Sequence, residues 1–281
     1  MPNNLPMEKK VQILNALVEG NSICSIVRML DVHKGAVLRL LREAGQRANE
    51  ILDKELVNLQ CRFVQCDEIW VFVQKKQKKC TEEEKRIGEV GDQYVFVAFD
   101  SDTKLVISHL IGKRTQENAT AFMKDLNFRI PTRFQLSTDA FNGYFGAVDS
   151  VFGADIDFGV IHKTYSNEIK TEKRYSPPQV VSVSLAVING NPVRKRISTS
   201  HIERQNLTMR MQMRRFTRLT NAFSKKLDNL KAATALHFFH YNFLRIHQSL
   251  RITPAMEARV TNHIWNWEEL LKINKSEKKA A

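Results

Sequence analysis

The chain has 281 residues, enough for one large hydrophobic core and a small accessory domain. Its 43 basic and 30 acidic residues give a formal net charge of +13, which favours a polyanionic partner such as nucleic acid. No apolar run approaches the roughly twenty residues of a membrane-spanning helix, and the first four residues carry no apolar signal core. We therefore expect an intracellular protein, cytoplasmic and associated with the nucleoid, with no membrane partner.

The cysteine pattern argues against a structural metal. The four cysteines contain no C-x-x-C pair, so we expect reduced thiols that mostly pack in the interior: Cys24, Cys61, Cys66 and Cys80.

The N-terminal segment predicts three short helices. The first runs from Met7 to Val18 and the second begins after a capping Ser22. A tight turn then leads into a third helix over 34–43. This order is typical of a helix-turn-helix, whose last helix enters the DNA major groove, although a plain three-helix bundle has the same pattern. We predict a DNA-binding domain over 1–47, joined by a helical linker over 48–60, with three candidate DNA contacts: Lys34, Arg39 and Arg42.

From residue 61 the pattern changes to strands. Apolar runs predict strands over 63–73, 94–100, 104–111, 134–138 and 157–161, with helices over 115–128 and 142–151 and a solvated lysine-rich loop over 75–86. Three strands followed by helix, strand, helix and strand is the order of the ribonuclease H fold. We therefore predict an α/β fold, with a ribonuclease H-like core built on a mixed five-stranded sheet, preceded by the all-α domain.

The rest of the chain completes this core. A β insertion is expected near 164–197, with Pro177-Pro178 at its start and a two-armed turn around 189–192. Two long helices follow, over 198–219 and 224–246, and a short helix begins at Thr253-Pro254. The catalytic domain would thus span 61–258, with a C-terminal helix and charged tail over 259–281.

Three acidic residues stand where an acid is costly unless it is paired or binds metal. Asp67 interrupts an apolar strand, Asp139 follows another, and Glu203 opens a basic helix. In a ribonuclease H fold, acids at these places converge at one edge, and three carboxylates suit Mg²⁺. Strand alternation points Asp67 and Glu68 to opposite faces, so only one is expected to line the site; Asp67 is preferred and Glu68 is the alternative. Asp100 is expected to be a turn residue.

The segment from 194 to 251 is strongly basic. It holds thirteen basic and two acidic residues, a net charge of +11. Helical spacing predicts that Glu203, Arg210 and Arg214 share a face, so that acid and phosphate-binding arginines project together. The candidate DNA contacts here are Arg204, Arg210, Arg214, Arg215 and Arg218, with His201 and Asn206 as auxiliary residues.

Several phrases resemble one family. Ser200-His201-Ile202-Glu203-Arg204-Gln205-Asn206 is similar to the glutamate motif of DDE transposases of the bacterial insertion element one family. Cys66-Asp67-Glu68-Ile69-Trp70 and Thr138-Asp139-Ala140-Phe141-Asn142 resemble its two aspartate motifs. The founding members carry an N-terminal zinc finger, and this chain has no such ligands.

The resemblance implies a DNA transposase that cleaves the ends of an insertion element and transfers the strands to target DNA. It implies Asp67, Asp139 and Glu203 as catalytic, metal-binding residues. The implied cofactor is Mg²⁺, with Mn²⁺ as a substitute, and the implied partners are double-stranded DNA and a homo-oligomer formed on DNA. Two alternatives stay open: a ribonuclease H-like nuclease without strand transfer, and a transposase-derived, non-catalytic DNA-binding regulator.

Overall fold

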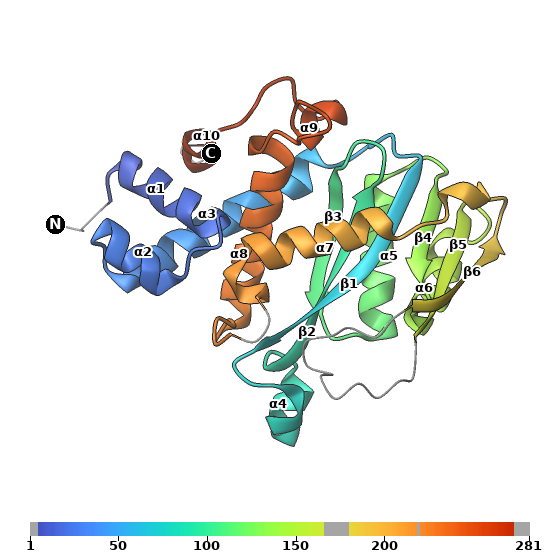
Figure 1. Ribbon diagram of the computed structural model, residues 1–281, viewed down its shortest axis with the longest axis horizontal. Helices are drawn as coiled ribbons and strands as arrows, with labels where there is room; N and C mark the ends of the chain where they lie inside the picture. The colour runs from blue at the N-terminus through green and yellow to red at the C-terminus, as the bar shows by residue number, and fades with distance from the viewer. Residues whose placement is uncertain (1–4, 166–179, 218–219, 273–281) are drawn as a thin grey trace, which may run out of the picture.

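The computed structural model describes residues 5–165, 180–217 and 220–272. Its centre is a six-stranded mixed sheet with strand order β3-β2-β1-β4-β5-β6 (Figure 1). The first three strands form an antiparallel meander: β1 (Phe63–Val73), β2 (Gly91–Asp100) and β3 (Val106–Gly112). β4 (Gln135–Asp139) and β5 (Asp157–Tyr165) add to the other edge of β1 in parallel. The sequence predicted these five strands in this order.

The sixth strand corrects the prediction of a five-stranded sheet. β6 (Val180–Asn189) pairs antiparallel with β5 and so extends the main sheet. The expected second arm of a separate β hairpin is instead a 3₁₀ turn at Arg194–Arg196. The free edge of β5 offers a longer run of backbone hydrogen bonds than a short return arm would. The expected diproline at 177–178 lies outside the described residues.

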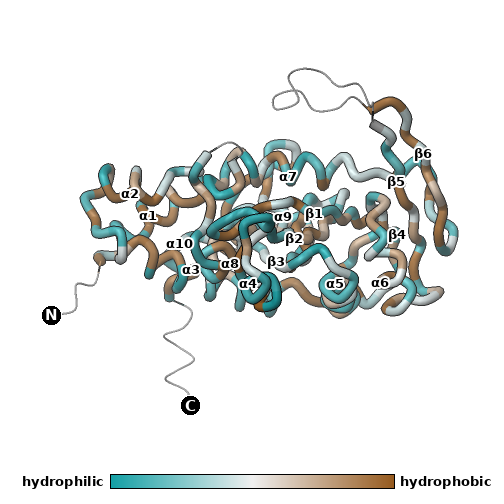
Figure 2. The backbone as a smooth tube through the Cα atoms, turned by 90° about the horizontal axis from the view of Figure 1, so that it is seen from below, coloured by the Kyte–Doolittle hydropathy of each residue, from teal (hydrophilic) through white to brown (hydrophobic). Residues whose placement is uncertain are grey.

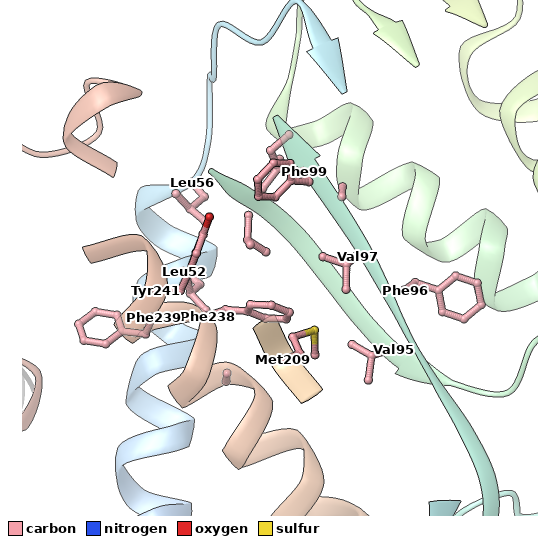
Figure 3. Close-up of a cluster of buried hydrophobic side chains, with 14 of the residues drawn as sticks. Leu52, Leu56, Val95, Phe96, Val97, Phe99, Met209, Phe238, Phe239 and Tyr241 are labelled. Carbon is pink, nitrogen blue, oxygen red and sulfur yellow. The ribbon is translucent and has the colours of Figure 1, made fainter. Parts of the chain in front are cut away.

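Helices cover both faces of the sheet. In Figure 2, α5 (Gln116–Arg129) and α6 (Asn142–Phe152) lie on one side of the strands and α7 (Ser200–Gln212) lies on the other. β2 is accordingly buried on both faces: Phe96 meets Phe122 of α5 and Tyr144 of α6. On the opposite face, Met209 of α7 and Phe238 of α8 (Leu227–Phe239) lie over β2 (Figure 3). The strongest core packing thus surrounds the strand next to β1.

The N-terminal helices begin where local signals place them. α1 (Met7–Val18) and α2 (Ile23–Leu30) have the predicted bounds, and the Ser22 hydroxyl accepts the cap hydrogen bond from the Ser25 N–H. α3 (Lys34–Glu55) starts at Lys34 as expected but runs on to Glu55, beyond the predicted end at 43 and through the predicted linker. Its second half packs so closely on α8 that a Cβ on Gly45 would lie 2.4 Å from the Ala232 carbonyl oxygen.

Polar contacts attach the N-terminal helices to the rest of the molecule. Buried Arg129 of α5 donates to the carbonyl oxygens of Leu52 and Leu56 at the end of α3. At the other end, Trp267 of α10 (Trp267–Lys272) donates its indole N–H to Asn15 of α1 at 2.6 Å. Figure 1 shows α10 beside α1 and α3. The three N-terminal helices are therefore packed on the core.

Three other expectations are corrected. The lysine-rich stretch over 75–86 is not a loop, because it contains a 3₁₀ turn at Gln77–Lys79 and a helix, α4 (Glu82–Ile87), which starts with a Thr81–Glu84 capping box. The helix expected over 198–219 ends at Gln212 and is followed by a 3₁₀ turn, Arg214–Phe216. The helix expected over 224–246 is α8, which continues into a π-helical turn, His240–Leu244.

Other features agree with the sequence. A short helix, α9 (Pro254–Glu257), begins at Pro254 with Thr253 as its cap. Asp100 is the last residue of β2 and holds the turn that follows, because its carboxylate accepts from the backbone N–H of Asp102 and from the Thr103 hydroxyl. All four cysteines are free thiols, and three of them are buried. Within the described ranges, no helix is both long and apolar enough to cross a bilayer.

Candidate active site

A cleft of about 660 Å³ lies between the centre of the sheet and the start of α7. All three predicted acids line it, although 72 and 64 residues of sequence separate them: Asp67 from β1, Asp139 from the end of β4 and Glu203 from the first turn of α7. Two cations share the lining, Arg114 and Lys163. The fold thus collects into one cleft the residues that the sequence marks separately.

Strand register sets the two aspartates together. β1 and β4 are parallel and their last paired residues are Cys66 and Thr138. Asp67 and Asp139 are the next residues on each strand, so they lie side by side just beyond the β1–β4 pairing, while Asp67 still pairs with Val97 of β2 and Asp139 with Ile161 of β5. Asp139 also accepts a hydrogen bond from the Phe141 N–H at 3.1 Å, which turns the chain into α6. Strand pairing therefore fixes the position of Asp139, and its hydrogen bond from Phe141 fixes the direction of the chain after it.

Glu68 is a fourth acid at the site. Strand alternation turns it away from Asp67, and it does not line the cleft. Its carboxylate nevertheless reaches the same place, because oxygens of Asp67, Glu68 and Asp139 all lie within 4.8 Å of one another. Of the two, only Asp67 lines the cleft, as expected, but the Glu68 carboxylate lies close to it, which was not expected. In the described part of the chain, the pairing of β1 with β4 ends at Cys66, and the next bridge on that edge of β1 joins Val73 to Ser224.

The crowding of these carboxylates changes their proton affinity. Burial, then the negative charges of Asp139 and Glu68, raise the pKa of Asp67 to about 7. Burial, then the negative charge of Asp139, raise the pKa of Glu68, and the Tyr144 hydroxyl and Arg114 oppose that rise only in part. Like charges held together away from water favour a proton or a bound cation.

Hydrogen bonds hold α7 against β1 at the cleft. The Gln65 side chain of β1 accepts from the N–H groups of His201 and Ile202, at 3.0 and 3.1 Å, and so satisfies the start of the helix. One turn on, the Asn206 amide donates to the Asp67 carboxylate at 2.8 Å. Glu203 accepts from the Thr199 hydroxyl at 2.6 Å. These contacts fix the orientation of two of the three acids.

The two cations were missed by sequence reasoning. Arg114 lies 3.1 Å from the Glu68 carboxylate and 3.7 Å from that of Asp139, with its guanidinium 4.1 Å above the ring of Phe141. Lys163, on β5, forms an ion pair with Glu203. No local motif marks either residue, because both reach the acids only through sheet pairing and a loop.

The donor set fits a divalent cation. Carboxylate oxygens are the hard ligands that Mg²⁺ and Mn²⁺ prefer. Four carboxylates lie near two cationic side chains. Glu68 Oε1 and the Tyr144 hydroxyl are both buried and, among the described residues, neither has a hydrogen bond of ordinary geometry, although the hydroxyl lies close enough to Glu68 to lower the pKa of that carboxyl. A cation near Asp67, Glu68 and Asp139 would satisfy the Glu68 oxygen and reduce the charge repulsion. Glu203 lies across the cleft, outside this group of three.

The auxiliary residues and basic side chains predicted to contact DNA lie in different settings. Asn206 reaches the site, whereas His201 lines a separate groove on another side of α7. Arg215 is half-buried and donates to the Ser224 hydroxyl, so it stabilises a loop. Because α7 ends at Gln212, Arg214 does not continue the helical face of Glu203. Arg210 is half-buried, Arg218 lies outside the described residues, and the exposed members are Lys34, Arg39, Arg42, Arg204 and Arg214.

Comparison with known proteins gives weak likenesses. No family model matches the chain, and no curated protein matches it. Among solved structures, a Mos1 strand transfer complex matches at 15% identity with a TM-score of 0.24, and a Mos1 transposase paired-end complex with left transposon end matches at 13% and 0.22. Each match covers 56% of this chain and 60% of the Mos1 chain. Similarity this low does not identify the function of the chain.

Proposed function

We propose that this protein is a DDE-class DNA transposase that cleaves the ends of an insertion element and joins them to target DNA. One observation carries the proposal: Asp67, Asp139 and Glu203, each in a phrase that resembles a transposase motif, line a single cleft. The order and pairing of the first five strands are those of a ribonuclease H-like core, which agrees with this proposal.

The chain's own residues suit a displacement at phosphorus. The acids would hold a divalent ion, Mg²⁺ or Mn²⁺, which supplies Lewis-acid stabilisation of the charge that develops on the phosphate. Asn206 orients Asp67, and Thr199 orients Glu203. Arg114 and Lys163 place positive charge beside the same space, where a phosphate group would lie.

The reaction would consist of two successive displacements. In the first, a water oxygen bonds to phosphorus, the P–O3′ bond breaks and a free 3′-hydroxyl remains. In the second, the oxygen of that 3′-hydroxyl bonds to the phosphorus of a target phosphodiester, and the target's own P–O3′ bond breaks. The proton of the attacking hydroxyl passes through solvent to the leaving oxygen, which becomes a new 3′-hydroxyl on the target strand. No covalent bond to the protein is needed. A cleft that is open to solvent allows a DNA strand to enter.

Recognition of the element ends is assigned to the N-terminal domain. α2 ends at Leu30 and α3 begins at Lys34, as expected of a helix-turn-helix, and Lys34, Arg39 and Arg42 are exposed on α3. We propose that these side chains contact DNA and that the protein assembles as a homo-oligomer on DNA.

The test uses the full chain and a supercoiled plasmid that carries the DNA flanking the gene on both sides. We expect cleavage with Mg²⁺ or Mn²⁺ and none with EDTA. Asp67→Asn, Asp139→Asn and Glu203→Gln should each abolish cleavage and leave DNA binding intact, whereas Glu83→Gln, an exposed acid on α4, should change neither. Undiminished cleavage by any one of the three site variants would remove that residue from the site.

A second assay separates the alternatives. Labelled duplexes of the same flanks, cut beforehand to leave a 3′-hydroxyl, are mixed with a target plasmid. Joined products identify a transposase. Cleavage in the first assay without joining in the second identifies a nuclease, and binding without either activity identifies a regulator.

A further inference from the structure

A second groove, of about 600 Å³, lies on another side of α7. Its walls come from α7, from the turn between β2 and β3, and from the segment after the π-helical turn. It shares no lining residue with the acidic cleft. The polar side chains that line it are Lys104, His201, Arg204, Gln205, Thr208, Tyr241, Arg245, His247, Gln248 and Ser249.

The groove is lined by basic and neutral groups. Lys104, Arg204 and Arg245 carry permanent charge, and no carboxylate is among the lining residues. The acids closest along the chain have other partners. Glu203 pairs with Lys163 in the cleft, Asp100 accepts from the Thr103 hydroxyl, and Asp102 forms ion pairs with Arg62 and Arg196. Asp100 and Asp102 still attract Lys104, but they do not line the groove.

His247 lies in the same positive field. Burial, then the positive charges of Lys104 and Arg245, lower the pKa of His247. An anion in the groove would relieve repulsion among these cations.

One buried donor in the lining has no partner. Gln205 is 2% exposed, and its Nε2 has no hydrogen-bond partner among the described residues. A buried N–H group without a partner costs stability, so such groups are usually satisfied by a ligand or water. Arg204 and Gln205 both line the groove, so an anion bound there can approach the guanidinium and the amide.

We propose that this groove binds the phosphodiester backbone of a DNA segment that crosses α7 from the acidic cleft. Glu203 lines the cleft and the next two residues line the groove, so one polyanion can reach both. Cations and amides that converge without a carboxylate are suited to phosphate oxygens. The inference that the polyanion is DNA rests on the proposed function. The inference that the groove binds an anion rests only on the residues that line it.

The test measures binding of the full chain to a labelled random-sequence duplex in EDTA, across a range of salt concentrations. Arg204→Gln/Arg245→Gln should bind roughly tenfold more weakly and lower the slope of log K against log[salt] by about two, the value for two lost phosphate contacts. Arg204→Lys/Arg245→Lys keeps the charge and should keep the slope. The matched control, Lys79→Gln/Arg86→Gln, removes two charges from exposed residues at the opposite end of β2 and should behave as the unaltered chain does.

Each outcome decides one of the two proposals. If the groove variant binds the duplex as the control does, the groove inference is wrong, whatever the cleavage assay gives. If it loses binding while the unaltered chain cleaves nothing, the groove stands and the transposase assignment fails. The last measurement is the affinity of the unaltered chain and of the groove variant for inorganic phosphate alone. Tight phosphate binding that the variant abolishes, with duplex binding unchanged, would assign the groove to a small phosphorylated molecule and overturn the proposal.

Discussion

The acidic cleft and the basic groove use the same helix for opposite purposes. On one side of α7, Glu203 faces Asp67 and Asp139, and on another side Arg204 and Gln205 line a groove without acids. The cleft holds its acids by hydrogen bonds from Asn206 and Thr199, whereas Gln205 and the groove's cations face an opening. The net charge of +11 over 194–251 therefore does not describe one surface, because the helical periodicity of α7 places Glu203 in the acidic cleft and Arg204 in the basic groove.

The largest expected effect tests which acids belong to the cleft. Glu203→Gln should reduce metal-dependent cleavage to background, because Glu203 lines the cleft and is the only one of its acids that α7 contributes. Glu68→Gln should retain measurable activity, about 10- to 100-fold below that of the unaltered chain, because Glu68 approaches from outside the lining. Cleavage rates at saturating Mg²⁺ measure both. If Glu68→Gln lost more activity than Glu203→Gln, Glu68 and not Glu203 would be the third acid of the site.

A smaller effect is expected where the helix supports the cleft. Asn206→Ala removes the donor 2.8 Å from the Asp67 carboxylate, and activity or metal affinity should fall about 10- to 100-fold. Titration with Mn²⁺, followed by calorimetry, measures the affinity. Asn49→Ala, at an exposed asparagine of α3, serves as the control. Equal affinities for both variants would show that Asn206 does not position Asp67.

The pKa of Asp67 predicts how the cleft affects stability. The raised pKa, about 7, means that the folded protein binds this proton more tightly than the unfolded chain, whose aspartate has a pKa near 3.8. Stability is therefore lost as pH rises from about 4 to 7, and Asp67→Asn should avoid that loss. In EDTA at pH 8 the variant should melt roughly 5 °C higher than the unaltered chain, and the two should agree near pH 4.

Metal addition completes this experiment. Mg²⁺ at pH 8 should raise the melting temperature of the unaltered chain and leave that of Asp67→Asn nearly unchanged, since binding to the folded state alone adds stability. A melting difference that is the same at every pH would mean that Asp67 is not crowded by the other acids.

The smallest effect separates a structural arginine from those of the groove. Arg215→Leu should lower the free energy of unfolding by about 1–3 kcal/mol, because it removes the hydrogen bond to Ser224. The salt dependence of DNA binding should not change, in contrast to the Arg204→Gln/Arg245→Gln variant. Chemical denaturation and the duplex assay provide the two measurements. A reduced salt slope would place Arg215 on the DNA-binding surface.

Sequence reasoning succeeded where the cause is local. Ser22, Thr115 and Thr253 accept the capping hydrogen bonds predicted from residue type, and the first strand has its predicted bounds. It failed at α4, where the sequence carries the Thr81–Glu84 capping box of a helix but its many charges favoured a loop. It also extended α7 too far. Met213 and Phe216 are buried, so the apolar spacing continues through the 3₁₀ turn and does not mark where the α-helix ends.

By itself, the sequence determined the separate pieces: three acids in suitable phrases, the order of the first five strands, and a basic segment near the C-terminus. The tertiary structure decided how the pieces meet. It placed Glu68 beside Asp67, brought Arg114 and Lys163 to the acids, joined β6 to the main sheet and turned His201 away from the cleft. The physical reason is that strand pairing and helix packing join residues far apart in the chain. Local propensity and periodicity carry no information about such partners.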